Sequence, residues 1–230
     1  MRVTLPTGTP VELARAGAPR LGLVVVPDIW GLRPLFDDHA ARLARELRAE
    51  VAVVEPFPGP ALPAELEARV AAMRPDRAIA DDLRAAAALV GGAGPVAVLG
   101  FCMGGMEALK AAALGCFSLA VSCYGMIRVP PAWRAVDRGE PLDALDQPGR
   151  APVLAVVGGR DPFTPASDVA ALAALADVEV VRYPSGEHGF VHDPSRPTHR
   201  PADAADVWAR VHRAIRSQAV SGCAAPAPSA

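Results

Sequence analysis

Continuous apolar runs alternate along the chain with segments whose apolar residues recur every three or four positions. The run LGLVVV, residues 21–26, predicts a strand that is covered on both faces. The residues after it predict a helix, because their apolar members recur at helical spacing: Phe36, Ala40, Leu43, Ala44 and Leu47. The same order continues downstream. Further strands are expected in EVAVVEPF, at 96–99 and in SLAVSCYG, VLAVVGG and VEVVRYP, and further helices in PAELEARVAAM, in DRAIADDLRAAAALV and at 103–114.

Both ends of the chain and one internal stretch depart from this alternation. Two short strands, at 2–5 and 11–14, flank the turn-forming PTGTP and predict an N-terminal hairpin. The stretch 130–152 has no clear periodicity. Beyond it, Thr164 is expected to cap a helix with Pro165 at its first position, and the buried stripe of that helix is Val169, Leu172, Ala173 and Ala176. A closing helix buries Val207, Trp208, Val211 and Ile215.

Strands that alternate with helices predict an α/β protein with a mostly parallel, twisted sheet and helices on both faces. One domain over residues 1–218, followed by a disordered small-residue tail at 219–230, fits a chain of 230 residues. Sheets of this kind bind ligands beyond the carboxyl ends of their strands. Polar side chains follow the predicted strands at Asp28, Cys102, Asp161 and His188. The functional site is therefore expected at this edge of the sheet.

Composition narrows the class of partner. The net charge of −2 gives no electrostatic attraction to nucleic acid or to an anionic membrane, so a small-molecule partner is expected. No secretion signal or membrane-spanning run is recognisable, which predicts a cytoplasmic protein. The cysteines show neither a CxxC pair nor zinc-ligand spacing, so neither a disulfide framework nor a metal is expected. Cys116 and Cys123 are interpreted as structural, and Cys223 as an exposed thiol.

The sequence GFCMGG places a cysteine in the turn between a predicted strand and a predicted helix. Such a turn holds its central residue in a strained conformation, and Gly100 and Gly104 remove the Cβ atoms that would clash there. The side chain of Cys102 then lies at a helix N-terminus, where the dipole favours a thiolate over a thiol. The backbone N–H of Met103 would point at a developing oxyanion. The alternative is that Cys102 is a small buried apolar residue, as free cysteines often are.

Two downstream motifs supply partners for a cysteine nucleophile. In this kind of fold the nucleophile is followed along the chain by an acid and then by a histidine, and GGRDPFTP and SGEHGF follow in that order. Asp161 and His188 fill the two roles. Asp161 alone could be a turn carboxylate before a helix, and His188 alone could be a solvated loop residue. His39, His199 and His212 are assigned no role in the site.

These motifs together resemble the dienelactone hydrolase family of the α/β-hydrolase fold over about residues 21–215. The matching pieces are PDIWGL, GFCMGG, GGRDPFTP and GEHGFVHDPSR. The resemblance implies a catalytic triad of Cys102, His188 and Asp161, with a second oxyanion amide from Ile29 beside that of Met103. It also implies that no separate lid domain covers the site.

The chain departs from the dienelactone-cleaving members of that family at two positions. Asp28 stands where those members have a glutamate that controls the state of the cysteine. His192 stands where they have an arginine that binds the substrate carboxylate, and a neutral imidazole is a weaker clamp for a carboxylate than a guanidinium. Asp28, Trp30, Tyr124 and His192 are the candidate substrate-binding residues.

The sequence thus predicts a carboxylic ester hydrolase, which cleaves a small lactone, enol ester or aryl ester through a thioester and needs no cofactor. It is of the carboxymethylenebutenolidase type. Two alternatives remain open: a thiol redox-sensing or ligand-binding protein on the same fold, and an acyltransferase. A monomer and a homodimer are both compatible with the sequence.

Overall fold

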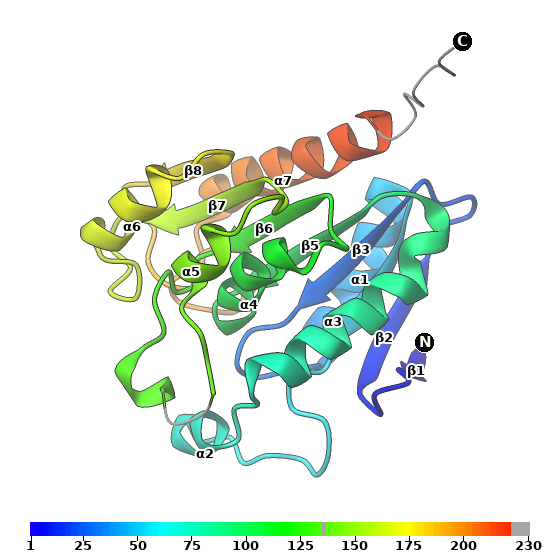
Figure 1. Cartoon of the computed structure of the whole chain (residues 1–230), viewed down its shortest axis with the longest axis horizontal. Coiled ribbons are helices and arrows are strands. Elements are labelled where there is room, and N and C mark those ends of the chain that lie inside the picture. The colour runs from blue at the N-terminus through cyan, green and yellow to red at the C-terminus, as the bar shows by residue number, and fades with distance from the viewer. Residues whose placement is uncertain (135–136, 222–230) are drawn as a thin grey trace.

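An eight-stranded sheet forms the centre of the protein (Figure 1). The computed structural model describes residues 1–134 and 137–221. The strand order is β1-β2-β4-β3-β5-β6-β7-β8, in which β1 and β2 are antiparallel to their neighbours and all other pairs are parallel. The strands are β1 (Arg2–Thr4), β2 (Pro10–Arg15), β3 (Leu21–Val26), β4 (Ala49–Val54), β5 (Val96–Phe101), β6 (Leu119–Cys123), β7 (Val153–Gly158) and β8 (Val178–Tyr183). The predicted α/β architecture and the N-terminal hairpin are confirmed.

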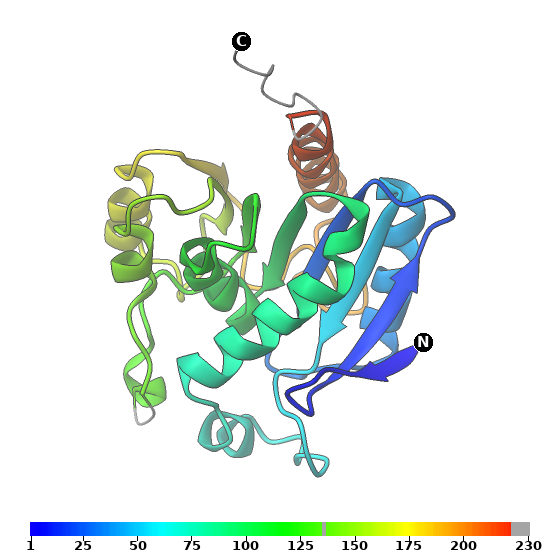
Figure 2. The ribbon, with the colours of Figure 1, turned by 45° about the vertical axis from the view of Figure 1, so that its right-hand side comes forward.

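Helices cover both faces of this sheet, as Figures 1 and 2 show from two directions. One face packs against α1 (Pro34–Leu47) and α7 (Pro201–Ser221), and the other against α3 (Asp76–Val90), α4 (Met103–Ala111), α5 (Pro141–Leu145) and α6 (Ala166–Ala173). The short helix α2 (Leu66–Ala71) buries none of its residues and lies outside these layers. In the described part of the chain, no helix is long and apolar enough to cross a bilayer.

The central strands are buried over their whole length because helices lie on both sides of them. Every residue of β3, β4, β5, β6 and β7 is buried, which matches the continuous apolar runs of the sequence. The apolar residues expected on α1 are all buried, and so are Val207, Val211 and Ile215 of α7, whereas Trp208 is only half-buried. The sheet and its two helical layers therefore form one rigid support for the loops at the carboxyl ends of the strands.

Several helix boundaries differ from the prediction. The first helix after β4 shrinks to α2, which buries none of its residues completely, although Val70 packs partly buried against a core cluster. Pro165 is the residue that precedes α6, rather than its first residue, and Thr164 makes no capping hydrogen bond. Val169 and Leu172 are buried as expected, but Ala173 and Ala176 are exposed. Helix α7 continues to Ser221, past the expected start of the tail, and residues 222–230 lie outside the described residues.

Candidate active site

The turn between β5 and α4 holds Cys102 in a strained backbone conformation. Its φ is 56° and its ψ is −119°, and its N–H donates to the carbonyl of Cys123 at 3.0 Å. A Cβ on Gly100 would lie 1.8 Å from the carbonyl oxygen of Gly104, and one on Gly104 would lie 2.2 Å from that of Val26. Only glycines fit on either side of the cysteine. Cys102 is the N-cap residue of α4 and is partly exposed.

His188 and Asp161 reach this turn from the loops after β8 and β7. The Nδ1–H of His188 donates to Oδ2 of Asp161 at 2.8 Å, and the other carboxylate oxygen accepts the N–H of Phe163 at 2.8 Å. The side chain of Cys102 lies close enough to His188 to raise the pKa of the ring. The two loops approach so closely that a Cβ on Gly158 would lie 2.5 Å from the carbonyl oxygen of Gly186. The structure therefore brings together all three residues that the sequence singled out.

The protonation of His188 reflects these two partners. Burial lowers the pKa of the ring, but the hydrogen bond that the ring donates to Asp161, and then the side chain of Cys102, outweigh burial and raise the pKa to about 10. The side chain of His188 is only 15% exposed, so solvent screens these interactions weakly. The ring is thus an imidazolium at neutral pH, held between a carboxylate and a sulfur atom.

Two backbone amides near Cys102 are free to bind an oxyanion. Within the described residues, neither the N–H of Met103 nor that of Ile29 donates to an acceptor. The close contact of Gly104 with the carbonyl oxygens of Val26 and Pro27 brings the start of α4 against the end of β3, which precedes Ile29. The expected pair of oxyanion amides therefore comes from two adjoining segments.

Asp28 is buried beneath the Ile29 loop and accepts hydrogen bonds on both of its oxygens. Oδ1 accepts from the N–H of Trp30 at 3.0 Å and from Nη1 of Arg33 at 2.7 Å. Oδ2 accepts from Nη2 of Arg33 at 2.9 Å and from Nε2 of His192 at 2.8 Å. Burial opposes the charge of Asp28, but the bonds from His192 and Arg33 keep the pKa of this carboxyl well below its usual range.

The candidate residues Tyr124 and His192 belong to the same buried network. The hydroxyl of Tyr124 donates to Nδ1 of His192, whose Nε2–H is bonded to Asp28. Burial lowers the pKa of His192, so the ring is neutral. Asp28, Tyr124 and His192 are each at most 1% exposed. The expectation that these three bind substrate is revised, because their polar atoms bind one another and face away from solvent.

Three residues that the sequence analysis did not assign to the site complete its surroundings. His39 on α1 donates from Nε2 to the carbonyl of His192 at 2.8 Å, although it was expected to have no role. Arg33 is the residue just before α1, and the sequence analysis assigned it no role. The ring of Phe163 lies edge-on to that of His188, with 4.8 Å between centroids. These three residues come close to the site residues through long-range packing, and no local sequence pattern indicates that they do.

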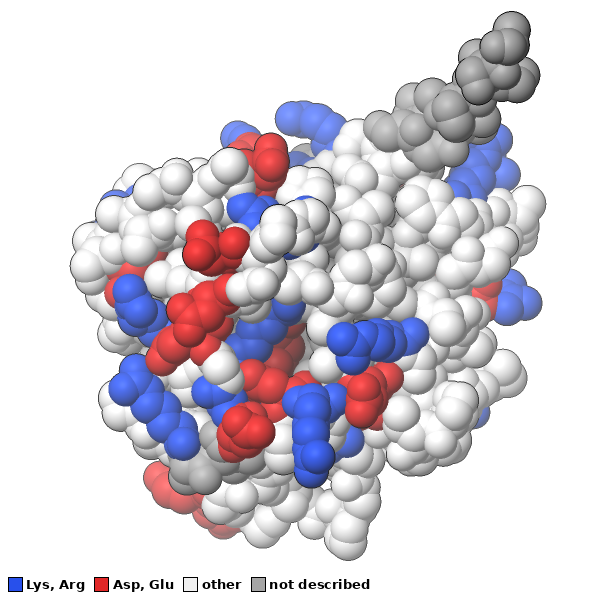
Figure 3. Space-filling model, viewed as in Figure 1, with Lys and Arg blue, Asp and Glu red and all other residues white. Residues whose placement is uncertain are grey.

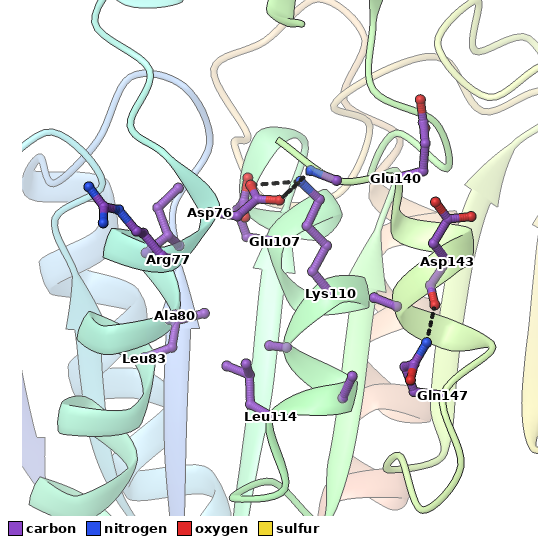
Figure 4. Close-up of a pocket in the computed structure, with 15 residues that line it drawn as sticks. Asp76, Arg77, Ala80, Leu83, Glu107, Lys110, Leu114, Glu140, Asp143 and Gln147 are labelled. Carbon is purple, nitrogen blue, oxygen red and sulfur yellow. Dashed lines mark hydrogen bonds and ion pairs between the residues drawn. The ribbon is translucent and has the colours of Figure 1, made fainter. Parts of the chain in front are cut away.

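A separate groove of about 400 Å³ lies between α3, α4 and α5 (Figure 4). Charged side chains of both signs gather on this face of the molecule (Figure 3). In the groove, Lys110 donates to both oxygens of Asp76 at 2.9 Å. Two further carboxylates of the groove pair with arginines outside its lining, Glu107 with Arg138 and Glu140 with Arg134. The groove contains no residue of the Cys102 site. In the described parts of the chain, no cluster of His, Cys, Asp or Glu is suited to hold a metal ion.

Comparisons with known proteins agree with this geometry. Residues 59–218 match the model of the dienelactone hydrolase family. A Yersinia pestis protein assigned as a carboxymethylenebutenolidase is 32% identical over 205 residues, which cover 82% of this chain and 75% of the relative. A Bradyrhizobium protein assigned as a 2-oxo-3-(5-oxofuran-2-ylidene)propanoate lactonase is 26% identical over 202 residues, which cover 81% of this chain and 79% of the relative.

A solved structure shows the same fold. The crystal structure of a Klebsiella pneumoniae protein assigned as a dienelactone hydrolase superposes with a TM-score of 0.80 at 24% identity, and the match covers 96% of this chain and 97% of that one. The sheet order and the strained turn after β5 define an α/β-hydrolase. Within that class, the chain belongs to the dienelactone hydrolase family, which consists of hydrolases.

Proposed function

We propose that the protein is a cysteine-dependent hydrolase of small lactones, enol esters or aryl esters. The observation that carries the proposal is the strained Cys102 beside a histidine that Asp161 orients. The reaction that the Yersinia pestis relative is assigned, lactone opening by a carboxymethylenebutenolidase, is of this type. Asp28, Tyr124 and His192 support the loop of Ile29 and do not contact substrate.

The chemistry follows from the positions of these groups. The thiolate of Cys102 attacks the carbonyl carbon, and the electron pair of the C=O bond moves to the oxygen, which the amides of Ile29 and Met103 stabilise. When this intermediate collapses, the bond to the leaving oxygen breaks and His188 donates its proton to that oxygen. A water molecule then gives a proton to His188 and attacks the thioester. Release of the acid returns the thiolate and the imidazolium.

Burst kinetics test this function. With p-nitrophenyl acetate we expect one equivalent of nitrophenolate per active site in a rapid phase, followed by slower turnover, and both are lost in Cys102→Ala. Cys116→Ala, at a partly buried cysteine outside the site, serves as the control and keeps the burst. Intact hydrolysis in Cys102→Ala would refute the proposal. Turnover that requires an added alcohol or amine acceptor would instead indicate an acyltransferase.

A further inference from the structure

Two aromatic rings contact the ring of His188, and they differ in their exposure. Tyr124 lies edge-on to it with 5.4 Å between centroids, and Phe163 lies edge-on to it with 4.8 Å between centroids. Tyr124 is fully buried, and its hydroxyl donates to His192. Phe163, in contrast, is 49% exposed. Tyr124 therefore belongs to the interior, whereas Phe163 presents aromatic surface to solvent beside the histidine.

The side chain of Phe163 contributes little to the hydrophobic core. Among the described residues, it is not a member of any of the three apolar clusters that form the core. Single exposed apolar residues are common on protein surfaces and need no functional explanation. Phe163 differs from such residues because the ring that it contacts belongs to the histidine assigned to proton transfer.

The backbone of the loop after β7 holds Phe163 in place. Pro162 and Pro165 restrict the chain on either side of it. The N–H of Phe163 donates to Oδ1 of Asp161 at 2.8 Å, and the N–H of Thr164 donates to the carbonyl of Asp161 at 3.3 Å. A side chain on a loop fixed in this way loses little conformational freedom when a ligand packs on it, so the contact costs little entropy.

The proposed mechanism places the leaving group close to this ring. His188 gives its proton to the leaving oxygen, and the proton comes from Nε2 because Nδ1 is bonded to Asp161. Proton transfer requires the leaving oxygen to lie about 3 Å from Nε2. The group attached to that oxygen then lies next to the imidazole, and a planar group of similar size can reach the ring of Phe163.

We infer that Phe163 determines specificity for the leaving group: an aromatic leaving group packs on its ring, so aryl esters are favoured over alkyl esters of comparable reactivity. This inference rests on the proposed function of Cys102. Contact between two aromatic rings removes apolar surface of both from water and adds the favourable interaction of their quadrupoles. A small alkyl leaving group covers less of the exposed ring and lacks the second contribution.

Two acetate esters that share their acyl group test the inference. Phenyl acetate has an aromatic leaving group, and trifluoroethyl acetate has a small activated alkyl group. Both give the same acetyl-enzyme, so their kcat/KM values differ only through the steps up to the departure of the leaving group. In Phe163→Leu we expect kcat/KM for phenyl acetate to fall about tenfold through loss of an aromatic contact, and that for trifluoroethyl acetate to change less than about twofold.

Two further variants serve as controls. Phe163→Tyr keeps an aromatic ring and should leave both kcat/KM values within about twofold of those of the parent protein. Leu89→Ala removes apolar surface at a leucine that is 38% exposed on α3, a helix that contains no residue of the Cys102 site, and should change neither value. Thermal unfolding of each variant checks that it is folded.

An equal decline for both esters in Phe163→Leu would overturn the inference, because Phe163 would then act only by positioning His188. Unchanged values for both esters would overturn it as well. Cys102→Ala is measured in parallel. If that variant retained hydrolysis of phenyl acetate, the proposed function itself would fail. Loss of hydrolysis in Cys102→Ala, together with an unchanged ratio of the two esters in Phe163→Leu, would refute the leaving-group specificity alone.

Discussion

At the scale of single residues, the site depends on the pairing of a sulfur atom with an imidazole. Cys102 could be a buried apolar residue on the evidence of its turn alone, but a buried thiol of that kind needs no histidine beside it. The proximity of His188 and the strained φ of 56° together favour the catalytic interpretation. The turn can hold this strained conformation because the residues on both sides of the cysteine are glycines; any side chain there would clash with the backbone.

The raised pKa of His188 predicts how activity ends at alkaline pH. The imidazolium donates a proton to the leaving oxygen, so kcat/KM for an ethyl ester should fall as the pH rises through about 10. A p-nitrophenyl ester has a good leaving group and should fall less steeply. Asp161→Asn removes a partner that raises this pKa, and the descending limb should then move to lower pH. Steady-state rates between pH 7 and 11 provide the measurement.

Unfolding at high pH has to be separated from this effect. His188 has a folded-state pKa above its ordinary value of 6.5, so its contribution to stability is fully present below pH 6.5 and is lost as the pH rises through about 10. Circular dichroism at each pH shows whether the protein is still folded. Equal declines for the two esters in a folded protein would contradict the role of His188 as a proton donor.

At the scale of structural elements, the loop between β3 and α1 does most to shape the site. It contains the amide of Ile29, and the carboxylate of Asp28 beneath it is bonded to Arg33 at the start of α1 and to His192 in the loop after β8. Pro34 at the first position of α1 restricts the backbone just after Arg33. The network therefore ties an oxyanion amide to elements on both sides of it.

Removal of the guanidinium should disturb this loop. In Arg33→Met we expect kcat for p-nitrophenyl acetate to fall about tenfold with little change in KM, because a displaced oxyanion donor weakens the transition state more than the ground state. Loss of the charged hydrogen bonds should lower the free energy of unfolding by about 2 kcal/mol. Arg33→Lys should recover part of both, and Arg84→Met, at an exposed position on α3, is the control. Stopped-flow kinetics and urea unfolding measure these changes, and an unaltered kcat in Arg33→Met would rule out a positioning role.

At the scale of the whole molecule, regular packing made most of the fold predictable. The buried strands have unbroken apolar runs, and α1, α3 and α7 have apolar stripes that match their buried faces. Helix α2 and the stretch 130–152 were harder to predict. Helix α2 buries none of its residues, and the described part of the stretch contains one 3-10 turn, at Pro131–Trp133, and the short helix α5. Their structure is set by contacts with distant segments, which periodicity does not record.

For the site too, the features with local sequence signals were predictable and those that depend on long-range contacts were not. Strand ends and glycine turns located Cys102, Asp161 and His188, since these signals are local. The partners of Asp28 were not predictable, because His192 lies 164 residues away and Arg33 reaches it only through the folding of the loop. A buried hydrogen-bond network requires that each donor meets an acceptor, and this condition applies only to the folded chain.

The buried neutral histidine on α1 predicts how the whole molecule responds to acid. Burial, and then the charge of Arg42, lower the pKa of His39 to about 4 in spite of its bond to the carbonyl of His192. The folded protein therefore favours the neutral ring of His39. The stability that this neutral ring contributes is fully present above pH 6.5, the pKa of the ring in the unfolded chain, and it is lost as the pH falls through about 4. The loss amounts to about 2–3 kcal/mol over that window.

His39→Gln can keep a donor toward the carbonyl of His192 and removes the titration, so its free energy of unfolding should depend less steeply on pH between 6.5 and 4. Some slope remains, because burial also lowers the pKa of His192. His199→Gln, at a histidine outside the network, should retain the slope of the parent protein. Urea unfolding at intervals of half a pH unit measures all three proteins. If the free energy of unfolding fell with pH equally in His39→Gln and in the parent protein, the acid sensitivity would arise elsewhere, because the variant has no titrating side chain at position 39.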